Sequence, residues 1–102
     1  MIATDTVYAS GNWVVTQGRE EEFIRRWIEF LQWTRAAFDD LGSARLIRDE
    51  ETPGRFVSFA TWKTSEALRE WRSRPEFAER MGACRALCDD FRGSSFALAA
   101  VV

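Results

Sequence analysis

The sequence predicts a single α+β domain spanning residues 1–102, with helices on one face of a four-stranded antiparallel sheet. Three observations support this prediction. The chain has the length of one domain and contains no repeat, low-complexity tract or linker. Segments rich in β-branched and aromatic residues are followed by segments whose apolar residues recur every three or four positions. Five Trp and eight Phe supply enough bulk for a core in so short a chain.

The first half of the chain predicts a strand, a long helix and a second strand. Residues 7–16 (VYASGNWVVT) contain β-branched and aromatic side chains and no proline, which favours a strand. The three glutamates at 20–22 suit the positive end of a helix dipole. An apolar stripe then continues the predicted helix to Leu41, and Gly42 is its expected stop. The second strand is expected at about residues 44–49.

The second half repeats this pattern in a different order. A turn at 52–54 (TPG) precedes the third predicted strand, residues 55–62. A short helix follows, and Pro75 restarts it at a position where the missing N–H costs nothing. An apolar stripe extends this helix to Phe91, and residues 94–102 form the last predicted strand. The order βαββαβ is the ferredoxin-like arrangement, with the helices on one face of the sheet.

The last two predicted strands carry apolar residues on both faces. Every residue of 96–102 is apolar, and in the third strand Ala60 and Trp62 share one face while Val57 and Phe59 share the other. Helices cover only one face, and exposing the other would cost roughly 25 cal/mol per Å² of apolar surface. We therefore expect a second sheet stacked on the first. The alternative is that β-propensity alone placed these residues there.

Composition and charge exclude several classes of protein. The net charge is −2 and both signs are spread along the chain, so nothing favours binding to nucleic acid or to an anionic membrane. The longest apolar run, residues 96–102, is too short to span a membrane. Residues 1–5 lack the basic and apolar regions of a signal peptide, and two cysteines make no disulfide-rich pattern. We therefore expect a cytoplasmic protein.

The absence of histidine from the sequence removes much of ordinary enzyme chemistry. Neither a Ser-His nor a Cys-His nucleophile pair can form. The six glycines occur singly, so there is no phosphate-binding loop and no dinucleotide fingerprint. Cys84 and Cys88 are four residues apart, but no further ligand completes a zinc set. We interpret both cysteines as small core residues and predict no metal site.

The aromatic residues predict a pocket for a flat apolar ligand, although packing alone is the simpler interpretation of each tryptophan. Trp33 lies off the apolar stripe of the long helix, so it either meets a partner subunit or walls a pocket. Trp62 and Trp71 are expected beside the gap between helices and sheet. Asn12 lies mid-strand, where it either faces solvent or points into a cavity. Ser58 shares a strand face with Trp62 and can line the same space.

Two stretches of the sequence carry a resemblance to a known family. One is the strand-to-helix passage WVVTQG (13–18) with EFI (22–24). The other is FATWKT (59–64), followed by EAL (66–68), Trp71 and PEF (75–77). In these motifs, and in the order and lengths of its elements, the chain resembles the antibiotic biosynthesis monooxygenase family of dimeric α+β barrels.

The resemblance implies that protomers pair sheet to sheet, in agreement with the two apolar faces. Some members are cofactor-free oxygenases that convert polycyclic phenols to quinones with dioxygen, using electrostatic stabilisation and positioning alone. Trp62 matches the Trp that members place at this strand end. Ser58 stands where the quinone-forming members carry an Asn, and Leu68 stands where they carry a Tyr. Arg80 or Arg85 matches an Arg of the second helix only loosely.

Other members of this family degrade haem with an axial His. This chain offers Trp62 and Asn12 at positions like theirs, but it has no His, and Met81 stands near the place of the ligand. Without a proximal ligand the iron would not be held in the usual way. We therefore reject haem degradation and expect no cofactor.

These arguments lead to two hypotheses of different classes. The first is a cofactor-independent monooxygenase that oxidises a small aromatic or polyketide-like phenol with dioxygen. The second is a non-catalytic dimeric binding module for a small apolar ligand. The candidate catalytic residues are Trp62, Asn12 and Ser58, and the candidate pocket residues are Trp33, Phe59, Trp71, Phe77 and Met81.

Overall fold

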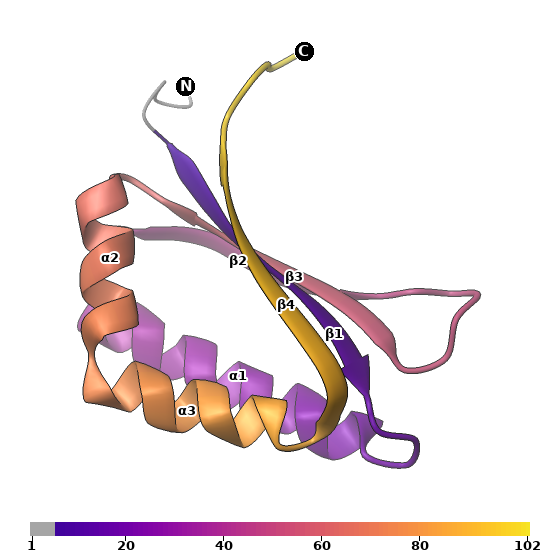
Figure 1. The fold of residues 1–102 in the computed structure, drawn as a ribbon. Helices are drawn as coiled ribbons and strands as arrows, with labels where there is room; N and C mark the ends of the chain where they lie inside the picture. Colours follow the sequence, from indigo (N-terminus) through magenta and orange to yellow (C-terminus); the bar gives the residue numbers. More distant parts are fainter. Residues whose placement is uncertain (1–5) are drawn as a thin grey trace.

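The computed structural model describes residues 6–102; residues 1–5, where the sequence shows no signal-peptide pattern, lie outside the described residues. The four strands form one antiparallel sheet in the order β2-β3-β1-β4 (Figure 1). The predicted α+β, ferredoxin-like arrangement is confirmed, with the second helical region divided into α2 and α3 at Arg74. The elements are β1 (Val7–Val15), α1 (Glu20–Ala37), β2 (Leu41–Arg48), β3 (Arg55–Trp62), α2 (Ser65–Ser73), α3 (Pro75–Arg85) and β4 (Cys88–Ala97).

All three helices lie on one side of the sheet, and α1 and α3 run side by side (Figure 1). In the central strands β1 and β3, buried residues alternate with more exposed ones, because successive side chains of a strand point to opposite faces. We call the covered side the helix face; its residues on the two central strands are Ala9, Gly11, Trp13 and Val15 of β1 and Phe56, Ser58, Ala60 and Trp62 of β3.

The other side of the sheet, which we call the open face, is covered by no helix (Figure 1). It mixes polar residues with apolar ones, several of which are well exposed: Ile47 is 52 % exposed and Phe96 is 55 % exposed. The register places the following residues on this face: Tyr8, Ser10, Asn12 and Val14 of β1, Arg45 and Ile47 of β2, Val57, Phe59 and Thr61 of β3, and Arg92, Ser94 and Phe96 of β4.

The first helix ends earlier than predicted. The sequence predicts a helix to Leu41 with Gly42 as its stop, but α1 ends at Ala37 and both residues belong to β2. Phe38 leaves the helix with extended backbone angles (φ −134°, ψ 119°), while its N–H still donates to the Thr34 carbonyl. Phe38 and Leu41 are both buried, so their spacing reflects a shared core and not a continuous helix.

The boundary between the last helix and the last strand is also misplaced in the prediction. The helix ends at Arg85, and Cys88 and Phe91 belong to β4. Phe91 lies opposite Trp13 across the strand pair, on the helix face. A register shift between Val14 and Val15 accommodates the start of β4. Cys88 and Phe91 continue the helical spacing of the apolar residues before them because all of these residues pack against one core, although these two lie in a strand.

The last strand ends at Ala97, and residues 98–102 have no regular secondary structure. The prediction that 94–102 form a strand with two apolar faces is therefore wrong for its second half. The sheet nevertheless has the apolar open-face side chains described above, from β2, β3, β1 and the end of β4. Apolar surface that no helix covers is therefore present, as the sequence predicts, but it is spread over all four strands and is not concentrated in β4.

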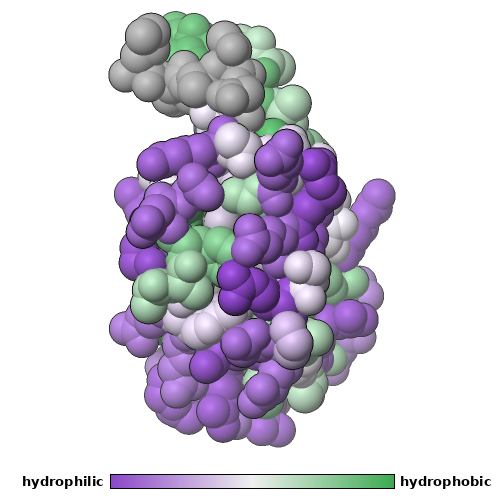
Figure 2. All heavy atoms as spheres, turned by 90° about the vertical axis from the view of Figure 1, so that its left-hand side faces the viewer, coloured by the Kyte–Doolittle hydropathy of each residue, from purple (hydrophilic) through white to green (hydrophobic). Residues whose placement is uncertain are grey.

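The outer surface of the helices is polar. Seen from the side that carries α2, charged and polar side chains cover most of the surface, with smaller hydrophobic areas among them (Figure 2). This agrees with the exposed Glu66, Arg69 and Glu70 of that helix. Within residues 6–102, no helix has the length and apolar character needed to cross a membrane.

Candidate functional site

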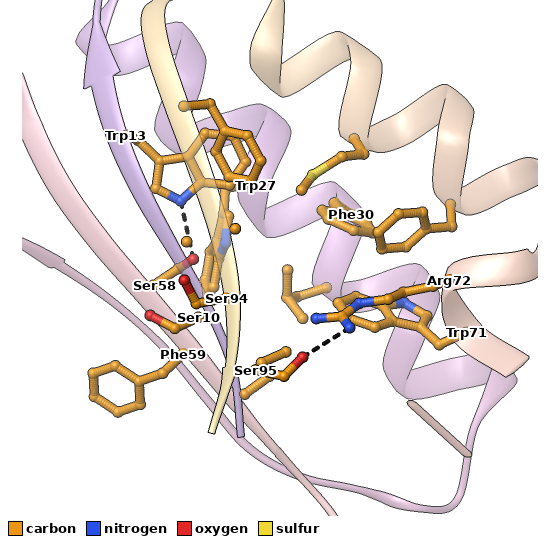
Figure 3. A pocket seen from close by; sticks show the side chains of 18 of the residues that line it. Ser10, Trp13, Trp27, Phe30, Ser58, Phe59, Trp71, Arg72, Ser94 and Ser95 are labelled. Atoms are coloured by element: carbon orange, nitrogen blue, oxygen red, sulfur yellow. Dashed lines mark hydrogen bonds between the residues drawn. The ribbon is translucent and has the colours of Figure 1, made fainter. Parts of the chain in front are cut away.

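A pocket of about 470 Å³ lies between the helix face of the sheet and the three helices (Figure 3). Its volume is in the range of sites for small organic ligands. Its walls are largely aromatic, which suits a flat apolar molecule. The large apolar side chains that line it are Trp13, Trp27, Phe30, Leu31, Trp71, Phe77, Met81 and Phe91.

Trp71 forms the wall on the side of α2. The Thr64 hydroxyl accepts a hydrogen bond from the Ala67 N–H, which caps α2 and begins the turn that carries Trp71. The Trp71 ring stacks on Phe30 with centroids 5.5 Å apart and planes 15° apart. Its indole N–H donates to the Thr34 hydroxyl at 3.0 Å, and that hydroxyl donates to the Phe30 carbonyl at 2.9 Å. The orientation of this ring is therefore fixed by a hydrogen-bond chain that runs from α2 to the backbone of α1.

Trp13 and Ser58 form the wall on the side of the sheet. The Trp13 ring contacts Phe23 and Phe91, at centroid distances of 5.1 and 4.3 Å. Its indole N–H donates to the Ser58 hydroxyl oxygen at 2.9 Å. Ser58 lies opposite Gly11 on the helix face of β3, where it lines the pocket as one of a few polar groups.

Positive charge enters the pocket from α2 and α3. The Arg72 guanidinium donates to the Ser95 hydroxyl of β4 at 2.8 Å (Figure 3), and desolvation by burial lowers the pKa of Arg72 without removing its charge at neutral pH. Arg85 also lines the pocket, with its guanidinium 5.3 Å from the Phe91 ring centroid. Of the described residues, no carboxylate, tyrosine or cysteine lines the pocket. The site is therefore suited to an anionic or electron-rich ligand.

Among the predicted site residues, Ser58, Trp71, Phe77 and Met81 line the pocket together. Phe59 only borders it: its strand position is on the open face, and Figure 3 shows its ring on the side of the sheet away from the helices. The structure therefore brings four of these side chains together and places that of Phe59 on the other side of the sheet.

Trp62 lies behind the pocket wall. It is only 1 % exposed, and it packs against Phe38 and Trp71 at centroid distances of 5.6 and 5.0 Å. Its indole N–H is buried and finds no hydrogen-bond partner in the part of the chain that the structure describes. In this arrangement Trp62 supports Trp71 from behind and does not itself reach the pocket.

Asn12 and Trp33 are separated from the pocket. Asn12 pairs with Val57 and Arg92 on the open face, so it lies on the side of the sheet opposite Ser58. Trp33 packs edge-on against Phe38 at 6.1 Å and lies under the Arg80 guanidinium at 5.5 Å. Its position off the apolar stripe is thus explained by contacts within the protomer.

Several residues that line the pocket were not singled out as site residues from the sequence, among them Trp13, Trp27 and Arg72. The alternation of β1 could have found Trp13, because it shares strand parity with Ala9 and Gly11 on the buried side. Nothing in the sequence distinguishes Arg72 from the other arginines of the helices. No group of three or more potential metal ligands occurs within residues 6–102, so the site offers no donor set for a metal ion.

Many solved structures are similar to the structure of this chain. SnoaB, a cofactor-independent oxygenase from Streptomyces nogalater, is 21 % identical over 96 % of this chain and 97 % of its own, with a TM-score of 0.86. A conserved Bacteroides thetaiotaomicron protein of unknown function, described as a possible oxidoreductase, is 16 % identical over 94 % and 100 % of the two chains, with a TM-score of 0.82. A proposed antibiotic biosynthesis monooxygenase from Caulobacter crescentus is 11 % identical over 95 % and 92 %, with a TM-score of 0.84.

At these identities the solved structures establish the fold alone. No curated protein matches the chain. The family model described as antibiotic biosynthesis monooxygenase matches residues 6–82, which include the central strands β1 and β3, the edge strand β2, the helices α1 and α2 and most of α3. The chain therefore belongs to the antibiotic biosynthesis monooxygenase family.

Proposed function

We propose that this protein is a cofactor-independent oxygenase that oxidises a polycyclic or polyketide-like phenol with dioxygen. The observation that carries the proposal is an aromatic pocket whose polar groups include a hydroxyl at Ser58 and a guanidinium at Arg72, with no acidic residue of the described chain beside them. Family membership and the fold shared with a cofactor-independent oxygenase support it.

The chemistry asks little of the protein beyond charge stabilisation. A phenolate is electron-rich enough to reduce dioxygen, so a site that favours the ionised substrate starts the reaction. The guanidinium of Arg72, an exposed residue that lines the pocket, lowers the free energy of that anion by Coulomb attraction. One oxygen atom of dioxygen enters the ring carbon as the quinone oxygen, and the other leaves as water with the two hydrogens lost from the phenol.

The spacing of the polar groups suits an extended ring system. Ser58 on β3 lies opposite Gly11, and Ser95 on β4 lies opposite Ala9, so β1 separates the two serines. Two strand spacings and an offset of two residues put their backbones roughly 12 Å apart. This is comparable to the length of a fused tricyclic phenol with oxygens at both ends. Such a molecule contacts Ser58 with one oxygen and Arg72 with the other.

Oxygen uptake tests the proposal. The native protein should consume oxygen with at least one member of a panel of dihydroxyanthracene-type phenols, and Arg72→Gln should lower kcat/KM by about 100-fold. Arg69→Gln is the matched control, because Arg69 is an exposed arginine of the same helix outside the pocket. Trp62→Phe tests whether the support of Trp71 matters to turnover. No uptake across the panel would count against an oxygenase.

The second candidate function is a binding module for a small apolar ligand. It is favoured by one observation: among the described residues that line the pocket, none is an ordinary general base, and only arginines carry charge. Calorimetric titration of the same phenols distinguishes the two functions. Tight binding without oxygen consumption would identify a binding module, whereas consumption identifies an enzyme.

We propose that the protein works as a homodimer in which two open faces stack. Exposed apolar residues of that face, Ile47 and Phe96 among them, support this pairing because their burial would stabilise the contact. Light scattering at micromolar concentration should give the mass of a dimer, and a monomeric mass would contradict the proposal.

Both cysteines are free thiols, which supports a reducing compartment such as the cytoplasm.

A further inference from the structure

One buried side-chain hydrogen bond connects two central strands within the pocket wall. It joins the indole N–H of Trp13 to the hydroxyl oxygen of Ser58 at 2.9 Å, between residues 45 apart in sequence (Figure 3). We infer that Trp13 is a positioning residue: it holds the Ser58 hydroxyl so that this hydroxyl donates a hydrogen bond to an oxygen of the ligand. The inference rests on the proposed function in placing a phenolic oxygen at Ser58.

The direction of this hydrogen bond leaves one hydrogen to be donated. An indole N–H is a donor only, so the Ser58 oxygen must be the acceptor. The Ser58 hydrogen therefore points elsewhere, and residues 6–102 contain no side-chain hydrogen bond that uses it. Ser58 lines the pocket and is 8 % exposed, so the space in front of the hydroxyl is that of the ligand.

The indole cannot turn away from Ser58 without disrupting the core. Trp13 is 2 % exposed, and its ring packs against both Phe23 and Phe91. An accepted hydrogen bond also polarises the Ser58 O–H group and makes it a stronger donor. Trp13 thus fixes both the place and the donor character of a small polar group in an apolar wall.

Gly11 provides the space that this hydrogen bond needs. It lies between the two side chains on the helix face, opposite Ser58 in the register. A Cβ atom at Gly11 would come within 2.7 Å of the Trp13 indole nitrogen and 2.9 Å of the Ser58 oxygen. Both distances are shorter than non-bonded contacts allow, so any side chain at this position displaces the pair. The three residues therefore act as one unit.

This unit selects for ligands that carry a hydrogen-bond acceptor, and it favours an anionic oxygen over a neutral hydroxyl. It should consequently lower the pKa of a bound phenol. A hydroxyanthraquinone is a suitable probe, because its phenolate absorbs at longer wavelength than the neutral form and it does not consume oxygen. The absorbance of the bound probe across a pH series then reports its pKa directly, without any turnover.

The test compares five variants with the native protein. Trp13→Phe, Ser58→Ala and Gly11→Ala should each raise the pKa of the bound probe by about one unit, a tenfold change in its ionisation constant. The double variant Trp13→Phe/Ser58→Ala should raise it no further than Ser58→Ala alone. Trp33→Phe is the matched control, because Trp33 lies outside the pocket, and it should leave the pKa unchanged.

A merely structural role for Trp13 would lower stability or affinity without moving this pKa, and that result would overturn the inference. Failure of the native protein to bind the probe would overturn it too. If Trp13→Phe does not fold, Gly11→Ala decides the matter, because it keeps both side chains. An oxygen-uptake failure alongside the expected pKa shifts would refute the oxygenase and leave the positioning role intact.

Discussion

Replacing Thr34 with valine should destabilise the fold by about 2 kcal/mol. Thr34 is completely buried, and its hydroxyl accepts the indole N–H of Trp71 while donating to the Phe30 carbonyl. Valine has almost the same shape and a similar helix propensity, so the substitution mainly removes the acceptor. A buried donor left without a partner costs about 1–3 kcal/mol. For a domain of this size, the midpoint of thermal unfolding should fall by about 10 °C.

Urea denaturation followed by tryptophan fluorescence measures this change, with all proteins at one concentration because association would contribute to stability. Thr34→Ser is the matched control, since it keeps the hydroxyl and loses only a methyl group, at about 1 kcal/mol. In a double-mutant cycle with Trp71→Phe, the cost of Thr34→Val should largely disappear. A free energy of unfolding for Thr34→Val within about 0.5 kcal/mol of the native value, or a serine variant less stable than the valine variant, would show that this hydrogen bond does not stabilise the fold.

Three further predictions concern other parts of the molecule. Hydrogen bonds from the backbone N–H groups of Glu51 and Thr52 and from Arg55 lower the pKa of Asp49. Asp49→Ala should therefore be less stable than the native protein at neutral pH, and the difference in stability should shrink as the pH falls through that lowered pKa. Equal denaturation midpoints at pH 7 would contradict this. Burial raises the pKa of Cys84 to about 12 and that of Cys88 to about 11. Both thiols should therefore react slowly with an aromatic disulfide reagent at pH 8 until urea unfolds the protein. Immediate labelling of the folded chain would contradict this prediction. Phe59→Asp places a charge in the proposed interface and should give a monomer by sedimentation, whereas an unchanged mass would move the interface away from the open face.

The topology was readable from the sequence because each element agrees with its own local pattern. The β-branched residues predict β1, the glutamates at 20–22 predict the start of α1, and Pro53-Gly54 predict the turn before β3. The boundaries were harder because core residues keep their apolar character on both sides of a helix end. Phe38 and Leu41 extended the stripe of α1 past its end, and Cys88 and Phe91 did the same for α3.

The site was less predictable than the fold for a physical reason. A large aromatic ring is equally suitable for a packed core and for a pocket wall, so composition does not separate Trp62, which is buried behind the wall, from Trp71, which forms it. Strand parity did place Ser58 on the helix face, and it also separates Asn12 from Ser58. The position of Arg72 depends on how α2 lies against β4, which no local pattern contains.

The contact between Trp62 and Trp71 has a spectroscopic consequence. The two indole rings are 5.0 Å apart and inclined by 37°, and they join β3 to α2. At this separation the electronic transitions of two chromophores couple, and a tilted pair gives two circular-dichroism bands of opposite sign. The protein thus carries an intrinsic optical reporter of the packing between this helix and the sheet. A ligand that displaces Trp71 should alter the paired bands while the signal of the helical backbone stays constant.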